Sequence, residues 1–260
     1  MKTTVTFLGT GGSQGVPFIG CRCAVCCSAD RRDRRLRSSI LIERGDVKIL
    51  IDAGPDLRYQ LLRAEVRQIE GVVLTHEHKD HIGGLDELRA LNFVDYPIIR
   101  RINIYGTEHV LDIVRKDYDY VFVSKKYKGV PELTAVTIHP PQPFEVAGVR
   151  FQPIVGQHSD RFVTTGYRVG DFAYLTDFKA ISDEEVERLV GVDTLIVNAL
   201  RFEDNPSHFT VAEALSLIYR VKPRRSFLTH ISHDMGLYSD VNPRLPEGVT
   251  LAYDTLKIEI

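Results

Sequence analysis

The sequence predicts an α/β fold in which two β-sheets are flanked by helices. Short apolar runs rich in β-branched residues follow one another along the chain, segments with helical periodicity lie among them, and no clear linker interrupts the pattern. The chain has 260 residues, of which 43% are hydrophobic, so it can bury a sizeable core. We therefore expect a single domain over residues 1–260.

The expected strands are short runs bounded by glycine, proline or charged residues. They are Thr4–Gly9, Ser38–Glu43, Val47–Asp52, Gly71–His76, Ile102–Gly106, Val149–Val155, Phe162–Val169, Phe172–Asp177, Asp193–Asn198, Arg225–His230 and Thr255–Ile260. The expected helices are Asp56–Ala64, Gly84–Leu91, Glu108–Arg115, Asp183–Leu189 and Val211–Val221. Thr210 is a good N-cap for the last helix, because Glu213 follows it at the spacing of a capping box.

Composition narrows the class of protein. No apolar run approaches the ~20 residues of a membrane span, and the N-terminal segment does not resemble a signal peptide, so a cytoplasmic protein without a membrane partner is expected. The net charge of -2 gives no global sign of nucleic-acid binding, which is therefore not expected. One basic run, Arg31–Arg37, allows two interpretations: a solvated loop, or a basic rim from which one or two arginines approach a substrate phosphate.

The segment "THEHKDHIGG" concentrates potential metal ligands. His76, His78, Asp80 and His81 fall within six residues. Imidazole and carboxylate suit zinc, manganese or iron, and alternation along an extended segment places His76 and His78 on one side. Two divalent metals ~3.5–4 Å apart are the usual arrangement for phosphoester hydrolysis, so a dinuclear metal site is predicted.

This H-x-H-x-D-H segment, followed by two glycines, resembles the metallo-β-lactamase superfamily. Three further positions match its pattern, each after a predicted strand: His158, Asp177 and His230. The resemblance implies a four-layer αββα sandwich and a metal-dependent hydrolase. It assigns His76, His78 and His158 to one metal, and Asp80, His81 and His230 to the other. Asp177 would bridge the two metals, and Asp52 would support the site from behind.

All four cysteines lie in "GCRCAVCC", where disulfides, a redox pair and a metal site are the possible roles. A reducing compartment favours metal ligation or catalytic thiols. Together with "LGTGGSQGVP" and "THISH", the segment resembles the phosphoribosyl 1,2-cyclic phosphate phosphodiesterase (PhnP-like) subfamily. That resemblance implies a structural zinc held by Cys21, Cys23, Cys26 and His233, within an N-terminal zinc-binding loop at about 20–37. A Cys₄ site using Cys27 and a redox role for Cys26 and Cys27 remain alternatives.

The same resemblance implies a phosphodiesterase whose partner is a small phosphodiester, 5-phosphoribosyl 1,2-cyclic phosphate or a related ester. Asp80 would orient the nucleophile as well as bind metal. His208 would bind phosphate and assist the leaving group, because an imidazole can donate both a hydrogen bond and a proton. A homodimer is common among such proteins. A tRNA 3′-processing nuclease and a thioester or lactone hydrolase are the alternative functions.

The glycine-rich segment Gly9–Pro17 leaves two interpretations open. Its backbone N–H groups could face an anion, or its glycines could serve a tight turn. It does not match a P-loop, because no Gly-Lys-Ser/Thr follows.

Overall fold

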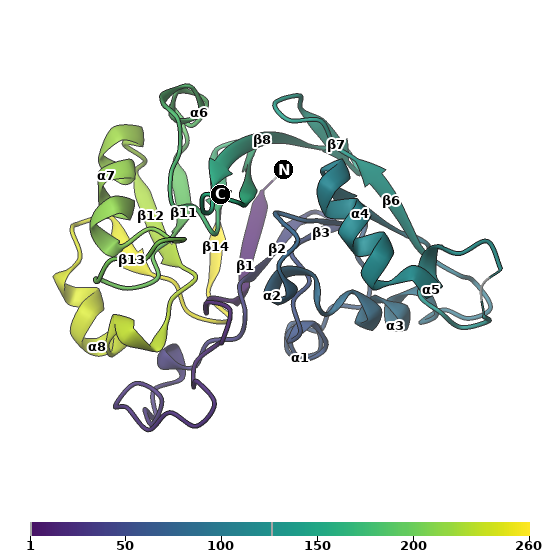
Figure 1. Ribbon diagram of the computed structural model, residues 1–260, viewed down its shortest axis with the longest axis horizontal. Helices are drawn as coiled ribbons and strands as arrows, with labels where there is room; N and C mark the ends of the chain where they lie inside the picture. Colours follow the sequence, from purple (N-terminus) through teal and green to yellow (C-terminus); the bar gives the residue numbers. More distant parts are fainter. Residues whose placement is uncertain (1, 126) are drawn as a thin grey trace.

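The strands form two seven-stranded sheets, in a computed structural model that describes residues 2–125 and 127–260 (Figure 1). The first has the order β14-β1-β2-β3-β4-β5-β6 and the second β13-β12-β11-β10-β9-β8-β7. The first sheet contains β1 (Thr3–Gly9), β2 (Ser39–Arg44), β3 (Val47–Ile51), β4 (Gly71–Val73), β5 (Ile102–Gly106), β6 (Leu133–Thr137) and β14 (Lys257–Glu259). The second contains β7 (Phe144–Val146), β8 (Val149–Gln157), β9 (Val163–Val169), β10 (Phe172–Leu175), β11 (Thr194–Asn198), β12 (Arg225–Thr229) and β13 (Val249–Leu251).

Helices cover the outer face of each sheet. The helices are α1 (Leu57–Arg63), α2 (Lys79–Ile82), α3 (Arg89–Asn92), α4 (Glu108–Asp117), α5 (Asp119–Phe122), α6 (Asp183–Glu187), α7 (Val211–Val221) and α8 (Tyr238–Val241). Figure 1 shows α1–α5 beside the first sheet and α6–α8 beside the second. The predicted sandwich of two sheets between helical layers is confirmed.

Side-chain alternation along the strands builds three apolar layers. In β2, Ile40 and Ile42 belong to the cluster between the sheets, whereas Leu41 belongs to the cluster beneath the helices of the first sheet. Leu195 and Val197 of β11 likewise face α6 and α7, and Ile196 faces the other sheet. This period-two pattern is why strands buried on both faces read as continuous apolar runs.

Parallel pairing decides where the ligands meet. Strands β3, β4, β5 and β6 run parallel to one another, as do β10, β11, β12 and β13, whereas β3 is antiparallel to β2 and β10 is antiparallel to β9. Parallel strands present their carboxyl ends at one edge of a sheet, and polar residues that follow them gather there.

The predicted elements differ from the structure mainly at short segments. The sequence analysis did not predict β6, β7 or β13, of which the last two have three residues each. The helix expected over Gly84–Leu91 is a 3₁₀ turn, Leu85–Leu88, followed by the four-residue α3. The α7 capping box forms as predicted: Glu213 N donates to Thr210 Oγ1 at 3.2 Å, and Thr210 N donates to Glu213 Oε2 at 2.7 Å. Within the described residues, no helix is long and apolar enough to cross a membrane.

Candidate metal centre

A repeated Leu-Thr-ligand sequence closes three strands at the site. His76, Asp177 and His230 each follow a Leu-Thr pair at or just past the end of β4, β10 and β12, and each is at most 1% exposed. Asp177 and His230 have φ of 62° and 55°, in the left-handed region that non-glycine residues rarely adopt. Such conformations cost on the order of 1–3 kcal/mol each, so the surrounding sheets hold these residues in place.

The first group of ligands consists of His76, His78 and His158, whose candidate ligand atoms lie within 4.8 Å of one another. Nε2 of His158 lies 3.2 Å from Nδ1 of His78. Nδ1 of His158 lies 2.6 Å from the carbonyl oxygen of Ser207, so this nitrogen donates and Nε2 keeps its lone pair for the site. Nε2 of His76 is buried and has no hydrogen-bonding partner among the described residues.

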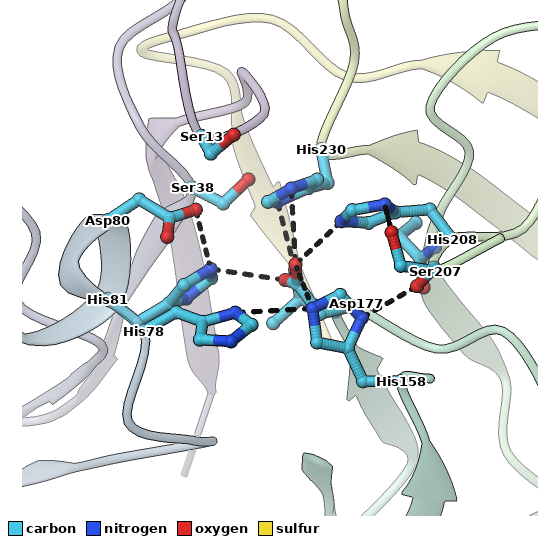
Figure 2. Close-up of polar contacts among 12 residues, drawn as sticks. Ser13, Ser38, His78, Asp80, His81, His158, Asp177, Ser207, His208 and His230 are labelled. Carbon is cyan, nitrogen blue, oxygen red and sulfur yellow. Dashed lines mark hydrogen bonds and ion pairs between the residues drawn. The ribbon is translucent and has the colours of Figure 1, made fainter. Parts of the chain in front are cut away.

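The second group surrounds Asp177. One carboxylate oxygen of Asp177 lies 3.1 Å from Nε2 of His81, and the other lies 3.2 Å from Nε2 of His230. Asp80 approaches the same His81 nitrogen at 3.1 Å. Figure 2 shows His81, His158, His208 and His230 gathered around Asp177. His158 lies 3.9 Å from Asp177, which therefore stands between the two groups.

Asp52 lies behind the ligands, as the resemblance implies. Its carboxylate contacts Nδ1 of His81 at 2.7 Å and accepts hydrogen bonds from the N–H and hydroxyl of Thr75 at 2.9 Å each. Asp52 is fully buried, with φ of 63°. A carboxylate on the far nitrogen of a ligating histidine fixes its tautomer and ring orientation.

The electrostatics of the site suit a cation. Burial lowers the pKa of His76 well below its usual value and that of His230 to about 4, which favours the neutral form of both rings, whereas Asp80, Asp177 and Asp52 overcome burial and raise the pKa of His81 well above its usual value. Burial opposes the ionisation of Asp177, but His230 and His81 hold its pKa well below the usual value. Neutral imidazole and ionised carboxylate are the states that bind divalent metals. The donor set and the partnerless nitrogen of His76 therefore fit a dinuclear metal centre.

His208 joins this centre from the loop that precedes α7. Its Nε2 lies 3.0 Å from Oδ1 of Asp177, and its Nδ1 lies 3.2 Å from Oδ1 of Asn205. That Asn205 oxygen also accepts the N–H groups of Ser207 and His208, which fixes the turn. The candidate ligand atoms of His208, His158 and Asp177 also lie within 4.8 Å of one another, so geometry alone allows His208 to bind metal or substrate.

The cysteine cluster forms on the N-terminal loop. The candidate ligand atoms of Cys21, Cys23, Cys26 and His233 lie within 4.8 Å of one another, and Nδ1 of His233 is 3.5 Å from the sulfurs of Cys21 and Cys23. A tetrahedral zinc with Zn–S of about 2.3 Å and Zn–N of about 2.0–2.1 Å requires an S···N separation of roughly 3.5 Å. Cys27 is exposed and lies outside the cluster, so the structure does not form the alternative Cys₄ site.

Three of the five arginines in Arg31–Arg37 make structural contacts. Arg35 is 4% exposed and donates to Thr10 Oγ1 and the carbonyl of Ala252. Arg37 pairs with Asp56 at 3.2 Å and donates to the carbonyl of Ser13. Arg32 pairs with Asp30 and lies over the ring of Tyr238. The run is therefore neither a simple solvated loop nor, at these three positions, a free basic rim.

Apart from Asp52, the groups that support the ligands were not predicted from the sequence. The hydroxyl of Thr75 contacts both Asp52 and His76, and that of Thr176 donates to Asp177 at 2.6 Å. The recurring Leu-Thr-ligand sequence was a signal that could have found them. Ser207 accepts a hydrogen bond at its carbonyl oxygen, and Asn205 stabilises a turn. Neither role has a recognisable sequence pattern.

Comparison with known proteins gives the family. The model of the beta-lactamase superfamily domain matches residues 47–231. A crystal structure described as a new diphosphatase from the PhnP family has a TM-score of 0.93 and 38% identity, covering 100% of this chain and 98% of that one. Zn²⁺-bound PqqB from Methylobacterium extorquens has a TM-score of 0.78 at 21% identity, covering 99% and 100%, and shows the shared fold.

A curated relative is longer than this chain. The octanoyltransferase of Porphyromonas gingivalis is 40% identical over 96% of this chain, and the chain spans 50% of that protein's length. With a family model that matches most of its length and a close PhnP-family structural neighbour, the chain belongs to the beta-lactamase superfamily, and the predicted class of metal-dependent hydrolase is confirmed.

Proposed function

We propose that this chain is a dinuclear-metal hydrolase of small phosphodiesters, including disubstituted diphosphates. One observation carries the proposal: six ligand residues and His208 gather around the seventh ligand, Asp177, in a chain that aligns over its full length with a PhnP-family diphosphatase. The ester predicted from the sequence, 5-phosphoribosyl 1,2-cyclic phosphate, remains a candidate substrate. A diphosphate-linked compound is the second candidate, because it is the kind of bond named for the neighbour.

Two sets of residues would hold metals. His76, His78 and His158 form one set, Asp80, His81 and His230 form the other, and Asp177 lies between them. Bound there, zinc, manganese or iron would supply the Lewis acidity that activates water and neutralises charge on phosphoryl oxygens. The cysteine cluster with His233 would hold one structural zinc, because its sulfur and nitrogen atoms already have the spacing of a zinc tetrahedron.

The chain's own residues divide the proton transfers of hydrolysis. Water gives up one proton to the solvent and attacks phosphorus, the P–O bond to the leaving group breaks, and the leaving oxygen takes a proton. We assign that proton to Nε2 of His208, which faces the centre, while Nδ1 is held by Asn205. Asp80 orients the attacking water from the opposite side, where Figure 2 shows its carboxylate.

His208→Ala tests this role. We expect turnover to fall by about 10²–10⁴-fold, the usual contribution of a general acid, while metal content stays unchanged. His139→Ala is the matched control, because His139 is an exposed histidine on the turn before β7. Loss of metal from His208→Ala would instead make His208 a ligand.

Phosphorus NMR tests the function and the substrate together. The metal-loaded protein is incubated with 5-phosphoribosyl 1,2-cyclic phosphate and, separately, with a nucleoside diphosphate sugar, and Asp80→Ala serves as the inactive control. Conversion of either compound by the wild type alone supports phosphodiester hydrolysis and distinguishes the two substrate classes. Failure with both compounds and with bis(p-nitrophenyl) phosphate would reject the proposal.

The tRNA-nuclease alternative needs a basic arm that grips RNA. The segment Pro97–Pro131 is basic and aromatic in places, but it contains β5, α4 and α5, and its residues Leu111, Val114 and Val121 are fully buried. Salt-sensitive binding of small RNAs would support this alternative.

The acyl-transfer relative supports a second candidate, a thioester hydrolase. The name octanoyltransferase applies to the whole relative, and this chain aligns with 50% of that protein's length. The match therefore does not show which half of the relative carries out the acyl transfer. Hydrolysis of an octanoyl thioester, absent in Asp80→Ala, would favour this candidate over the phosphodiesterase.

A further inference from the structure

A pocket lies along the part of β8 that β7 does not cover. Strand β7 pairs with β8 only over Val149–Phe151, and the pocket begins further along β8, at Val155. Its volume is about 640 Å³, within the range of about 300–1,000 Å³ that is usual for small-molecule sites. The apolar side chains of Val155, Val163 and Ile181 contribute to its lining, and Val163 is 60% exposed. The pocket therefore has the size and the apolar surface of a ligand site.

Backbone hydrogen bonds fix the walls of this pocket. On one side, the N–H of Gln157 donates to the carbonyl of Ala180 at 2.9 Å, and the N–H of Ala180 donates back at 3.0 Å. On the other side, the hairpin between β8 and β9 is closed by the N–H of His158, which donates to the carbonyl of Phe162 at 2.9 Å. Because these walls are already in place, a ligand that binds between them pays little for reordering the chain.

Phe162 connects the pocket to the metal centre. Its side chain belongs to the pocket wall and is 37% exposed. Its ring lies 4.7 Å from the ring of His78, at an interplanar angle of 67°, and 6.5 Å from the ring of His158. Phe162 therefore contacts the ligands of the first metal set on one side and the pocket on the other.

The proposed mechanism directs the leaving group toward this pocket. In an in-line displacement, the leaving group departs on the side opposite the attacking water. Asp80 orients that water, and His208 protonates the leaving oxygen. The ring of His158 lies 4.8 Å from that of His208, and Figure 2 shows both rings on the side of Asp177 that faces away from Asp80. A leaving group that departs beside His208 therefore passes His158 and reaches Phe162.

The rim of the pocket carries polar groups that suit the edge of a flat ring. Gln157 and Arg161 are exposed on this rim, and within the described residues their side chains make no hydrogen bond or ion pair. Amide and guanidinium groups both form hydrogen bonds with the edges of nucleobases. An aromatic face that accepts stacking, next to such groups, is the combination that proteins use to hold a single base.

We propose that this pocket binds a nucleobase carried by the leaving group, and that Phe162 selects leaving groups that carry one. The base stacks on the exposed part of the Phe162 ring, and Gln157 and Arg161 bond to its edge. The proposal rests on the proposed function and narrows its substrates to phosphodiesters derived from nucleotides.

A matched pair of cyclic esters tests the proposal. Adenosine 2′,3′-cyclic phosphate and methyl β-ribofuranoside 2,3-cyclic phosphate differ only at C1 of the ribose, which carries adenine in one and a methoxy group in the other. The leaving oxygen belongs to the ribose in both compounds. We expect the metal-loaded wild type to hydrolyse the adenosine ester with about tenfold higher kcat/KM, mainly through a lower KM, as for one stacked base.

Variants of Phe162 should change this ratio in a graded way. Phe162→Ala should reduce it toward one, whereas Phe162→Tyr, which keeps the aromatic face, should preserve it. Tyr219→Ala is the matched control, because Tyr219 is a 78% exposed aromatic residue on α7 and should leave the ratio unchanged.

The ratio separates recognition from a structural role. Phe162 also packs on His78, so a merely structural effect of Phe162→Ala would slow the hydrolysis of both esters equally, leave the ratio unchanged and overturn the proposal. Equal kcat/KM of the wild type for the two esters would overturn it too.

If neither cyclic ester is hydrolysed, calorimetry judges the pocket separately from the proposed function. Adenosine 3′-monophosphate must bind the metal-loaded protein at least about tenfold more tightly than methyl β-ribofuranoside 3-phosphate, with the advantage lost in Phe162→Ala. Equal affinity for the two compounds would reject the nucleobase site.

Discussion

The two ligand clusters of this chain are built in opposite ways. At the dinuclear centre, His76, His81, Asp177 and His230 are at most 1% exposed; His81 lies in the short helix α2, and the other three follow strands of the two sheets. The cysteine cluster lies on a loop, where N–H groups of Phe18, Cys23 and Cys26 donate to its sulfurs at 3.3–3.5 Å. Its apolar support is small, comprising Val16, Val25 and the partly buried Leu237 around the cysteines.

The sheets and helices of the fold position the side chains of the dinuclear centre, whereas the loop of the cysteine cluster has little regular structure and would be ordered by the metal it binds. Parallel strands deliver the first set of side chains whether or not a cation is present. Between β1 and β2, by contrast, the described chain forms only a three-residue 3₁₀ turn, Arg31–Asp33, and isolated bridges. If catalytic metals and a structural zinc bind as proposed, a rigid scaffold would hold the catalytic metals, and the zinc itself would stabilise its loop.

The largest expected effect comes from Asp177→Ala. This carboxylate contacts His81, His208 and His230, so its removal should lower phosphodiester hydrolysis by at least about 10³-fold and release catalytic metal. Elemental analysis should still find the zinc of the cysteine cluster, because no cysteine contact changes. Loss of all metal would show that the two clusters are not independent.

Removing a thiolate should have the complementary result. In Cys23→Ser, we expect loss of the structural zinc, retention of the catalytic metals, and faster proteolysis within residues 10–37. Cys27→Ser is the matched control, because Cys27 is exposed and should leave zinc content and proteolysis unchanged. His233→Ala should behave like Cys23→Ser. If Cys27→Ser lost zinc and His233→Ala kept it, the Cys₃His assignment would be wrong.

The predictability of the two clusters also differs. The H-x-H-x-D-H segment is local, so its ligands could be found by spacing, whereas His158, Asp177 and His230 were matched to the family's pattern through the resemblance, with their places after predicted strands in agreement. His233 could be matched to the cysteines only through a family resemblance, because 207 positions separate it from Cys26 and no local pattern links them. The strands were predicted best where both faces are buried, as in β3 and β11.

The sequence did not predict groups whose role depends on where the folded backbone places them. Arg35 reads as part of a basic run, yet it is buried against Thr10 and Ala252. The three-residue strands β7 and β13 carry too few apolar residues to produce a pattern, and they form because longer neighbours supply a pairing edge. Tertiary contacts, rather than local propensity, decide both cases.

A smaller effect is expected behind the dinuclear centre. Asp52→Asn keeps the size of the side chain but removes the charge that orients His81. Replacement of such a supporting group typically lowers metal affinity by about 10–100-fold, so metal titration should show weaker binding without loss of the fold. Ser28→Ala, which removes a half-buried hydroxyl that bonds to Asp33 and Asp30 in the N-terminal loop, should leave that affinity unchanged. Unchanged affinity in Asp52→Asn would show that His81 is oriented by Thr75 and the backbone alone.

The smallest effect tests how far the cysteine loop is prepared without zinc. In the metal-free protein, the N–H of Cys26 and the ring of His233 lower the pKa of Cys23 to about 6, whereas burial raises the pKa of Cys26 to about 11. Because the thiolate is the reactive form, alkylation of Cys23 should rise between pH 5 and 7 and then level off, and Cys26 should stay unreactive up to about pH 10. Peptide mass spectrometry after a pulse of iodoacetamide measures each rate, and added zinc should protect both residues while the exposed Cys27 continues to react. Parallel pH profiles for Cys23 and Cys26 would mean that the metal-free loop has lost the arrangement described here, which would make the contrast between the two clusters sharper still.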